Sequence, residues 1–261
     1  MHGLGNDFVI VDAREMDFAV TPQRAKAIAC RKRGIGCDQL IILRKSDRAD
    51  VFMEIWNADG SRVGACGNAT RCVGQLMMDE AHGVTASIET DTSLLSAKRS
   101  MVGISVNMGP ARTGWAEIPL ALEMDTAGGE LSLGPLSAPG FVNMGNPHAI
   151  FFAEDADKVD LPRIGPELEQ HSLFPEGANI SVASINGTTV RLRVWERGAG
   201  ITEACGSAAC AVVVAATRKG LLNRKATVKL NGGELQIEWL KDGTVQMAGP
   251  ATFVYAGECE L

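Results

Sequence analysis

The chain has 261 residues, of which 46% are hydrophobic and 21% charged, so it can bury a core without disulfide or metal staples. A net charge of −6 with scattered Lys and Arg argues against a nucleic-acid partner, and the apolar runs are shorter than the roughly 20 residues that span a bilayer. The first residues also lack the pattern of a secretory signal peptide. We therefore expect a cytoplasmic protein without nucleic-acid or membrane partners.

Short β-rich runs bounded by Gly, Asn, Asp or Pro occur in both halves of the chain and predict strands. The sequence Thr21-Pro22 predicts a helix through Cys30, with Thr21 as the N-cap and Pro22 at the first helical position. The predicted strands cover 8–11, 40–43, 51–55, 102–106 and 190–194.

Two further helices are predicted directly after cysteines. One follows Cys66 and runs to about Met78, and the other follows Cys205 and runs to Lys219, where Gly220 ends it. Both segments are apolar on nearly every face, so we expect each to be a buried helix wrapped by its own sheet.

Polar and reactive residues recur in the second half at a constant offset of 139 or 140 residues, which indicates two copies of one unit. We predict a mixed α/β (α+β) fold of two pseudo-symmetric domains, residues 1–107 plus 251–261 and residues 108–250, each a β-sheet around a central buried helix. Equivalent residues would then meet in a shared cleft. The recurring pairs are Asn6 and Asn146, Gln39 and Asn179, Asn57 and Glu196, and Cys66 and Cys205.

The seven cysteines show no Cys-x-x-Cys or nearby His pattern, so we expect no metal site. Cys66 and Cys205 lie at helix starts, where the positive end of the helix dipole favours a thiolate and hence a base. A thiolate on one side of an amino acid and a thiol on the other would exchange its α-proton with inversion. The other cysteines inside or near helices, Cys72, Cys210, Cys30 and Cys37, are interpreted as packing residues.

Removal of an α-proton leaves negative charge that needs stabilisation. No lysine has a recognisable pyridoxal-phosphate context, so we expect no cofactor. The N–H groups at two helix starts offer the alternative, because they bind a carboxylate and the charge that develops on it.

Several motifs together resemble the diaminopimelate epimerase family over nearly the whole chain. The family's fold is two pseudo-symmetric α/β domains, and the resemblance implies an isomerase that interconverts LL- and meso-diaminopimelate without cofactor or metal, on the route to lysine and peptidoglycan. The motifs are His2-Gly-Leu-Gly-Asn-Asp-Phe8, Gly34-Ile-Gly-Cys-Asp-Gln39, Asn57-Ala-Asp-Gly60, Ala65-Cys-Gly-Asn68, Met144-Gly-Asn-Pro-His148, Glu196-Arg-Gly-Ala-Gly200 and Ala204-Cys-Gly-Ser207.

The resemblance also implies residue roles. Cys66 and Cys205 would be the acid/base pair, and His148 would tune the site near Glu196, which would receive an ammonium. Tyr255 matches a position associated with dimer formation and implies a homodimer. The reacting carboxylate would be held by Gly67, Asn68, Gly206 and Ser207, and the remaining polar contacts would come from Asn6, Gln39, Asn57, Asn146, Asn179, Glu196 and Arg197.

Each of these residues has a plainer alternative. The three asparagines beside Gly or Pro, Asn6, Asn57 and Asn146, suit turns, and His148 could be a hydrogen-bonded core or surface residue. Glu196 and Arg197 could form a solvated pair, and Tyr255 could fill the first domain's sheet. The alternative functions are a proline or hydroxyproline racemase, and a non-catalytic thiol redox or amino-acid-binding protein.

Overall fold

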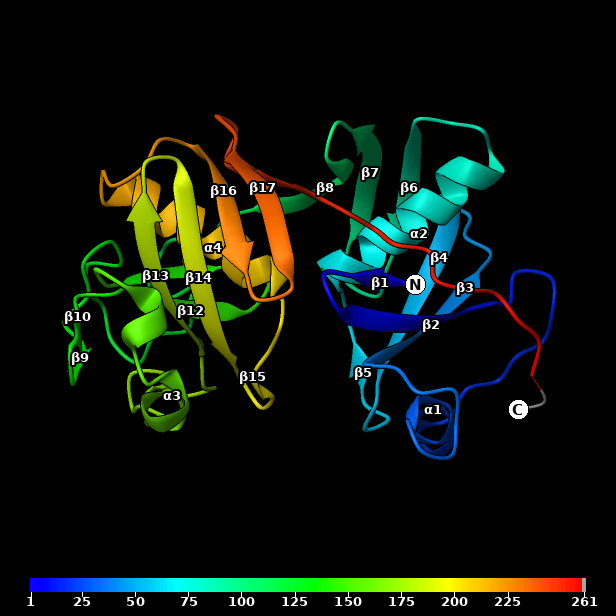
Figure 1. Cartoon of the computed structure of the whole chain (residues 1–261), viewed down its shortest axis with the longest axis horizontal. Coiled ribbons are helices and arrows are strands. Elements are labelled where there is room, and N and C mark those ends of the chain that lie inside the picture. Colours follow the sequence, from blue (N-terminus) through cyan, green and yellow to red (C-terminus); the bar gives the residue numbers. More distant parts are fainter. Residues whose placement is uncertain (260–261) are drawn as a thin grey trace. The chain divides into compact units, whose positions relative to one another are not determined.

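The computed structural model describes residues 1–259, which form two compact units (Figure 1). Unit 1 contains residues 1–107 and the segment from Ala248 onward, and unit 2 contains Met108–Met247. Residues 260 and 261, which the sequence analysis assigned to the first domain, lie outside the described residues. The chain therefore passes from unit 1 into unit 2 and back again.

Unit 1 is a β-sheet with two helices. Its first helix contacts β3 and β4, and its second contacts β1, β6 and β7. In chain order the elements are β1 (His2–Gly3), β2 (Asn6–Asp12), α1 (Pro22–Ala29), β3 (Gln39–Arg44), β4 (Val51–Asn57), β5 (Arg62–Val63), α2 (Gly67–Glu80), β6 (Thr85–Glu89), β7 (Leu94–Ser100) and β8 (Gly103–Pro110), in which the chain leaves the unit.

Unit 2 repeats this plan after a short two-stranded sheet. Its elements are β9 (Ser132–Leu133), β10 (Leu136–Ser137), β11 (Gly140–Asn143), β12 (Pro147–Phe152), a 3-10 turn (Ala156–Lys158), α3 (Leu161–Glu169), β13 (Asn179–Asn186), β14 (Thr189–Glu196), β15 (Gly200–Ile201), α4 (Gly206–Arg218), β16 (Lys225–Leu230), β17 (Gly233–Trp239) and β18 (Thr244–Gly249), in which the chain returns to unit 1.

The pairing of strands is the same in the two units. β2 pairs parallel with β3, which pairs antiparallel with β4; in unit 2, β12 pairs parallel with β13, which pairs antiparallel with β14. β4 also pairs with the short β5 and runs parallel to β6, as β14 does with β15 and β16. The structure thus supplies, element by element, the internal repeat that the constant offset predicts.

Each unit encloses a central helix, α2 (cyan in Figure 1) in unit 1 and α4 (gold) in unit 2. α4 is buried over most of its length, because most of its residues are Ala, Val or Cys. α2 approaches its sheet through Gly74, where an added Cβ would lie 2.6 Å from the Cβ of Ala97. In unit 2, Gly140 of the sheet approaches Ala215 of α4 in the same way.

The sheet of unit 1 is covered on both faces. Leu40 and Ile42 of β3 pack in the core cluster that contains the α1 residues Ala25 and Ile28, and Ile41, which points to the opposite face, is also fully buried. A strand buried on both faces needs a continuous apolar run, which is what residues 40–43 provide.

The predicted helices and strands are confirmed to within a few residues. Thr21 caps α1 by accepting a hydrogen bond from the Arg24 N–H at 3.2 Å, and Gly220 follows α4 with a φ of 71°. The predicted fold class, a mixed α/β protein with sheets around buried helices, is correct. The sequence analysis did not predict α3 or the strands β6, β7, β11–β13 and β16–β18, whose apolar residues are interrupted by charged ones or belong to short runs.

Candidate active site

Cys66 is the N-cap of α2, the central helix of unit 1. Its backbone is extended, and its carbonyl accepts the Thr70 hydroxyl at 2.8 Å and the Thr70 N–H at 2.9 Å. The Cys66 side chain does not cap the helix. The first N–H groups of α2, on Gly67 and Asn68, therefore have no intrahelical acceptor and suit an anion.

Cys205 holds the equivalent position in unit 2 as the N-cap of α4. Its backbone is also extended, and its side chain does not cap the helix. Its Sγ lies 3.5 Å from the hydroxyl of Ser207, and the residue is 5% exposed, whereas Cys66 is half-buried. The repeat thus places one thiol at the start of each central helix, in different degrees of burial.

In unit 1 two amide side chains, Gln39 and Asn57, lie next to each other where β3 begins and β4 ends, and we call this pair the row of unit 1. Gln39 and Asn57 face each other in the antiparallel ladder, and the Gln39 amide nitrogen donates to Asn57 Oδ1 at 3.0 Å. Asn57 Nδ2 donates in turn to Ser61 Oγ at 3.0 Å in the turn that leads to β5. Asn57 therefore closes this turn, as the plainer interpretation expects, and also belongs to the row.

The corresponding row in unit 2 contains a histidine, an amide and a carboxylate. His148 of β12 pairs with Asn179 of β13 in the parallel ladder. Asn179 lies opposite Glu196 of β14, because the Ile180–Trp195 pair is the neighbouring step of the antiparallel ladder. Asn179 joins two loops, since its Nδ2 donates to the Pro147 carbonyl and its Oδ1 accepts the Arg197 N–H, both at 3.0 Å. The constant offset in the sequence thus corresponds to equivalent sheet positions.

His148 is fully buried, so it is a hydrogen-bonded core residue rather than a surface one. Its Nε2 lies 2.8 Å from Asn146 Oδ1. Burial, followed by the positive charge of Arg197, lowers the pKa of His148 to about 3, so the ring is neutral at physiological pH. With Asn146 Oδ1 as the acceptor, Nε2 carries the proton and Nδ1 is left as a buried acceptor.

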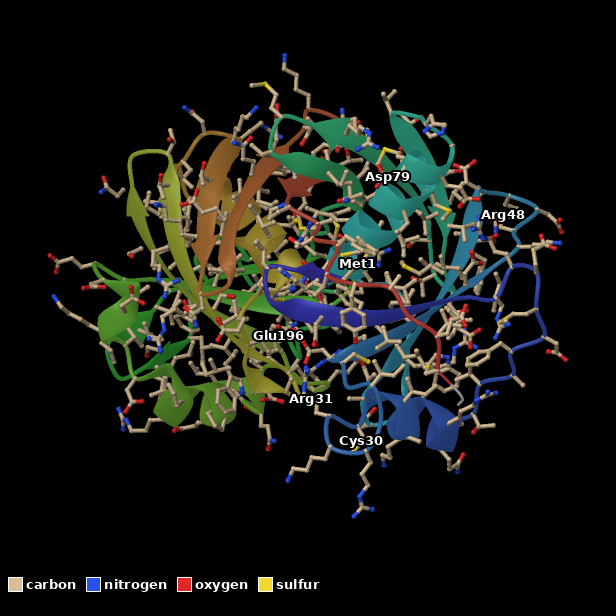
Figure 2. All side chains as sticks on the ribbon, turned by 45° about the vertical axis from the view of Figure 1, so that its right-hand side comes forward. Met1, Cys30, Arg31, Arg48, Asp79 and Glu196 are labelled. Atoms are coloured by element: carbon tan, nitrogen blue, oxygen red, sulfur yellow. The ribbon has the colours of Figure 1, made fainter. Side chains whose placement is uncertain are left out.

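Glu196 ends β14 and is labelled in Figure 2. Its carboxylate accepts a short hydrogen bond from the Thr202 hydroxyl. Burial raises the pKa of Glu196, although hydrogen bonds from Thr202 and Cys205 act in the opposite direction. It is not the solvated partner of Arg197, because the guanidinium donates to the Glu176 carbonyl at 2.8 Å.

The expectation that the helix start would favour a thiolate is wrong for Cys205. Burial raises the pKa of its thiol well above the ordinary value, and the negative charge of Glu196 raises it further. The hydrogen bonds from Ser207 and from the Ala208 N–H favour the thiolate but are outweighed. Cys205 is therefore a thiol in the structure at neutral pH.

The other cysteines differ from this pair. Burial raises the pKa of Cys72, inside α2, to about 12, and Cys210 is fully buried inside α4, as expected of packing residues. Cys37 is buried as well. Cys30 is half-buried at the end of α1, and the Lys32 N–H lowers the pKa of its thiol, so the packing interpretation does not hold there.

Buried polar atoms without hydrogen-bond partners occur in both rows and at the start of α2. Among residues 1–259 they include Gln39 Oε1, Asn68 Oδ1 and His148 Nδ1. Native proteins rarely leave such atoms unsatisfied, so these atoms are candidates for contact with a ligand.

The sequence analysis missed the carboxylate that holds Asn6, which belongs to Asp38. Asn6 Nδ2 donates to Asp38 Oδ2 at 3.0 Å, and Asn6 Oδ1 accepts from Asn68 Nδ2 at 3.2 Å. Asp38 in turn accepts from Arg31. Asp7 and Asp38 lie in the motifs that contain Asn6 and Gln39, so their positions in these motifs could have identified them as site residues.

Tyr255 lies in the segment that returns to unit 1 and is 67% exposed. The alternative that it fills the sheet of that unit is therefore wrong. Its neighbours Phe253 and Val254 are 53% and 57% exposed.

A model of the family described as diaminopimelate epimerase matches residues 1–114 and 140–254. The diaminopimelate epimerase of Rhodospirillum centenum is 51% identical over 99% of this chain and 90% of its own length. The chain belongs to the diaminopimelate epimerase family. Diaminopimelate epimerases are isomerases, so the predicted family and enzyme class are confirmed.

Solved structures with low sequence identity share the fold of this diaminopimelate epimerase family member. A phenazine biosynthesis protein of the PhzF family from Bacillus anthracis has a TM-score of 0.67 at 16% identity, covering 98% of this chain and 93% of that one. A probable proline racemase from Agrobacterium radiobacter has a TM-score of 0.65 at 12% identity, covering 94% and 88%. Within residues 1–259 no helix is long and apolar enough to cross a membrane.

Proposed function

We propose that the chain interconverts LL- and meso-diaminopimelate by moving the α-proton between Cys66 and Cys205, and so supplies precursors of lysine and peptidoglycan. The observation that carries the proposal is the equivalence of the two cysteines, each the N-cap of the central helix of one repeat. Membership of the diaminopimelate epimerase family supports the choice of substrate.

In the proposed reaction, the Cys66 thiolate takes the α-proton from one face of the substrate and becomes a thiol. The electron pair of the broken C–H bond passes into the α-carboxylate, where the N–H groups of Gly67, Asn68, Gly206 and Ser207 stabilise it. Cys205 then gives its proton to the opposite face and becomes the thiolate. The reverse reaction exchanges the two roles, and the proposal requires that one α-carbon reach both sulfur atoms.

The remaining polar residues would bind and orient the two amino-acid ends of the substrate. Glu196 would accept an ammonium group, and Arg197 would bind the distal carboxylate through parallel hydrogen bonds. His148 would hold Asn146 in place through the hydrogen bond at 2.8 Å. The remaining contacts are proposed for Asn6, Gln39, Asn57, Asn146 and Asn179.

We also propose that the chain is a homodimer that uses Tyr255. Exposed Phe253, Val254 and Tyr255 are consecutive apolar residues, which favours an interface over solvent exposure. Light scattering of the wild type and of Tyr255→Asp, compared with Val84→Asp at another exposed apolar residue, tests this. A monomeric wild type would contradict it.

The test of function is incubation of the freshly reduced protein with LL-diaminopimelate in heavy water, followed by NMR. We expect deuterium at the α-carbon together with meso product. Cys66→Ala and Cys205→Ala should each lose about 10³-fold or more in kcat, as expected when an acid/base group is removed. Cys72→Ala and Cys210→Ala are matched controls, because each removes a sulfur from the same helix outside the proposed site.

Other outcomes separate the alternatives. Turnover of proline or hydroxyproline, with none of diaminopimelate, would indicate a racemase of the proline type. Saturable binding of diaminopimelate without α-proton exchange would indicate a binding protein. Full activity with a confirmed Cys66–Cys205 disulfide would contradict the acid/base pair itself.

A further inference from the structure

We propose that Arg31, acting through Asp38, is a positioning residue that holds Asn6 and Asn68 in their substrate-binding orientation. The inference rests on the proposed function, because it assumes that Asn6 and Asn68 contact an amino-acid substrate. All residues concerned belong to unit 1.

Arg31 follows α1 (Figure 2) and lies between two carboxylates. Its Nη1 and Nη2 donate to both oxygens of Asp7 at 2.8 and 2.7 Å, and Nη2 also donates to Asp38 Oδ1 at 2.7 Å. The two aspartates are tied together by their backbones as well, since the Asp38 N–H donates to Asp7 Oδ1 at 2.8 Å and the Asp7 N–H donates to Asp38 Oδ2 at 3.1 Å. We call Arg31, Asp7 and Asp38 the ion triad.

The ion triad determines which way the Asn6 amide points. Hydrogen bonding to Arg31 lowers the pKa of Asp7, and a carboxylate can only accept hydrogen bonds. Asp38 accepts from Arg31 at Oδ1, and its other oxygen, Oδ2, receives the Asn6 NH₂ group at 3.0 Å. Asn6 Oδ1 then faces Asn68.

The orientation of the Asn6 amide in turn fixes the orientation of the Asn68 amide. It is the second residue of α2, two residues after Cys66, and it is 4% exposed. Its Nδ2 donates to Asn6 Oδ1, which leaves its Oδ1 as a buried acceptor without a partner. The relay from Arg31 to Asn68 therefore presents an oxygen for a donor group on a ligand, beside N–H groups that suit a carboxylate.

The same contacts should add little to the stability of the fold. Arg31 is 57% exposed at its side chain, and exposed ion pairs contribute little to the stability of proteins. Loss of Arg31 should thus change substrate affinity much more than thermal stability, which separates a positioning role from a structural one.

The chain offers a matched control at the other end of β2. Arg14 lies between Asp12 and Glu80, with Nη2 at 2.6 and 2.8 Å from their oxygens, in the same one-arginine, two-carboxylate arrangement. Neither Asp12 nor Glu80 has a hydrogen bond to a proposed site residue among the bonds that the structure shows for residues 1–259. Arg14→Gln therefore removes an equivalent ion triad without touching the relay.

The experiment compares Arg31→Gln, Arg31→Lys and Arg14→Gln in steady-state kinetics with diaminopimelate. We expect Arg31→Gln to raise KM about tenfold with kcat within about threefold of the wild type, because binding is weakened before the proton is moved. Arg31→Lys should be intermediate, since it keeps the charge but not the fork that bridges two carboxylates. Arg14→Gln should match the wild type.

A double-mutant cycle tests whether Arg31 acts through Asn6. In an Asn6→Ala background, Arg31→Gln should have little further effect on KM, because the group that it orients is gone. Equal effects of Arg31→Gln in both backgrounds, or equal KM changes in Arg31→Gln and Arg14→Gln, would overturn the proposal.

A readout without turnover keeps this inference separate from the proposed function. In NMR spectra of the substrate-free protein, the side-chain NH₂ signals of Asn6 and Asn68 should shift in Arg31→Gln and stay in place in Arg14→Gln. If the wild type lacks epimerase activity but these shifts occur, the function fails and the relay stands. Unshifted signals in Arg31→Gln would overturn the relay whatever the activity.

Discussion

The two cysteine-bearing helix starts share one backbone design and differ in their electrostatics. In unit 1, Cys66 is half-buried and its row consists of the neutral amides Gln39 and Asn57. In unit 2, Cys205 is 5% exposed, and the position equivalent to Asn57 is Glu196, whose charge helps raise the pKa of the thiol. A repeated fold can thus place two chemically identical groups in different electrostatic surroundings.

This difference suggests a division of labour in the proposed reaction. Cys205 suits the role of the acid, because burial and the carboxylate of Glu196 favour its protonated form. Cys66 suits the role of the base, because its row contains neutral amides. The resting protein would then be ready to act on the isomer that presents its α-proton to Cys66.

The largest expected difference is in thiol reactivity. At pH 7.5, iodoacetamide should modify Cys66 at least about a hundredfold faster than Cys205, because only thiolates react quickly and Cys205 is both buried and protonated. Peptide mass spectrometry over time measures both rates, and exposed Cys259 provides an internal reference. Equal rates at Cys66 and Cys205 would remove the basis of the comparison.

Glu196→Gln removes the charge that distinguishes unit 2. We expect kcat/KM to fall about ten- to a hundredfold, the effect of losing a hydrogen bond to a charged group worth about 1.5–3 kcal/mol. Cys205 should at the same time be alkylated faster than in the wild type, since the carboxylate no longer raises its pKa.

The same substitution should affect stability with a defined sign. The pKa of Glu196 is raised in the folded protein, so its stabilising contribution is present below about pH 4.5 and is lost as the pH rises through the folded value. Glu196→Gln should therefore be more stable than the wild type at pH 8, and gain less at pH 4, in thermal unfolding. A lower melting temperature at pH 8 would contradict this.

Asn57→Glu gives unit 1 the carboxylate of unit 2. A glutamate can still accept the hydrogen bond from Gln39, but its charge should disfavour a thiolate at Cys66. We expect about a tenfold loss in kcat/KM and slower alkylation of Cys66, with Asn57→Gln as the uncharged control. Unchanged Cys66 reactivity would show that the two rows are not electrostatically equivalent.

The last expected effect concerns the stability contribution of His148, for which the row of unit 1 has no titratable counterpart. Its pKa is about 3 when folded and about 6.5 when unfolded, so the unfolded chain binds more protons between these values and stability falls as the pH drops below about 6.5. The slope approaches about 1.4 kcal/mol per pH unit. His148→Gln should flatten the decline in unfolding free energy between pH 6.5 and 5, measured by denaturant unfolding, and an unchanged slope would contradict this.

Much of this arrangement could be predicted from the sequence, because equivalent residues of the two repeats recur at a constant offset. The helices after Cys66 and Cys205, and the rows that contain Gln39 and Asn179, follow from local pattern and constant offset. The pKa of Cys205 could not be predicted from its helix position, since burial and Glu196 outweigh the dipole. The ion triad could not be predicted either, because Arg31 and Asp38 lie far in sequence from Asn6, the residue that they orient.

The return of the chain to unit 1 has a consequence for synthesis on the ribosome. Thr252 pairs with His2, and the Pro250 carbonyl accepts a hydrogen bond at 3.2 Å from Arg71, which is fully buried in α2. Unit 2 is continuous in sequence, whereas unit 1 needs residues that are made after the whole of unit 2. The part of the protein that emerges first should thus be the last to finish folding, in contrast to the usual order of domains along a nascent chain.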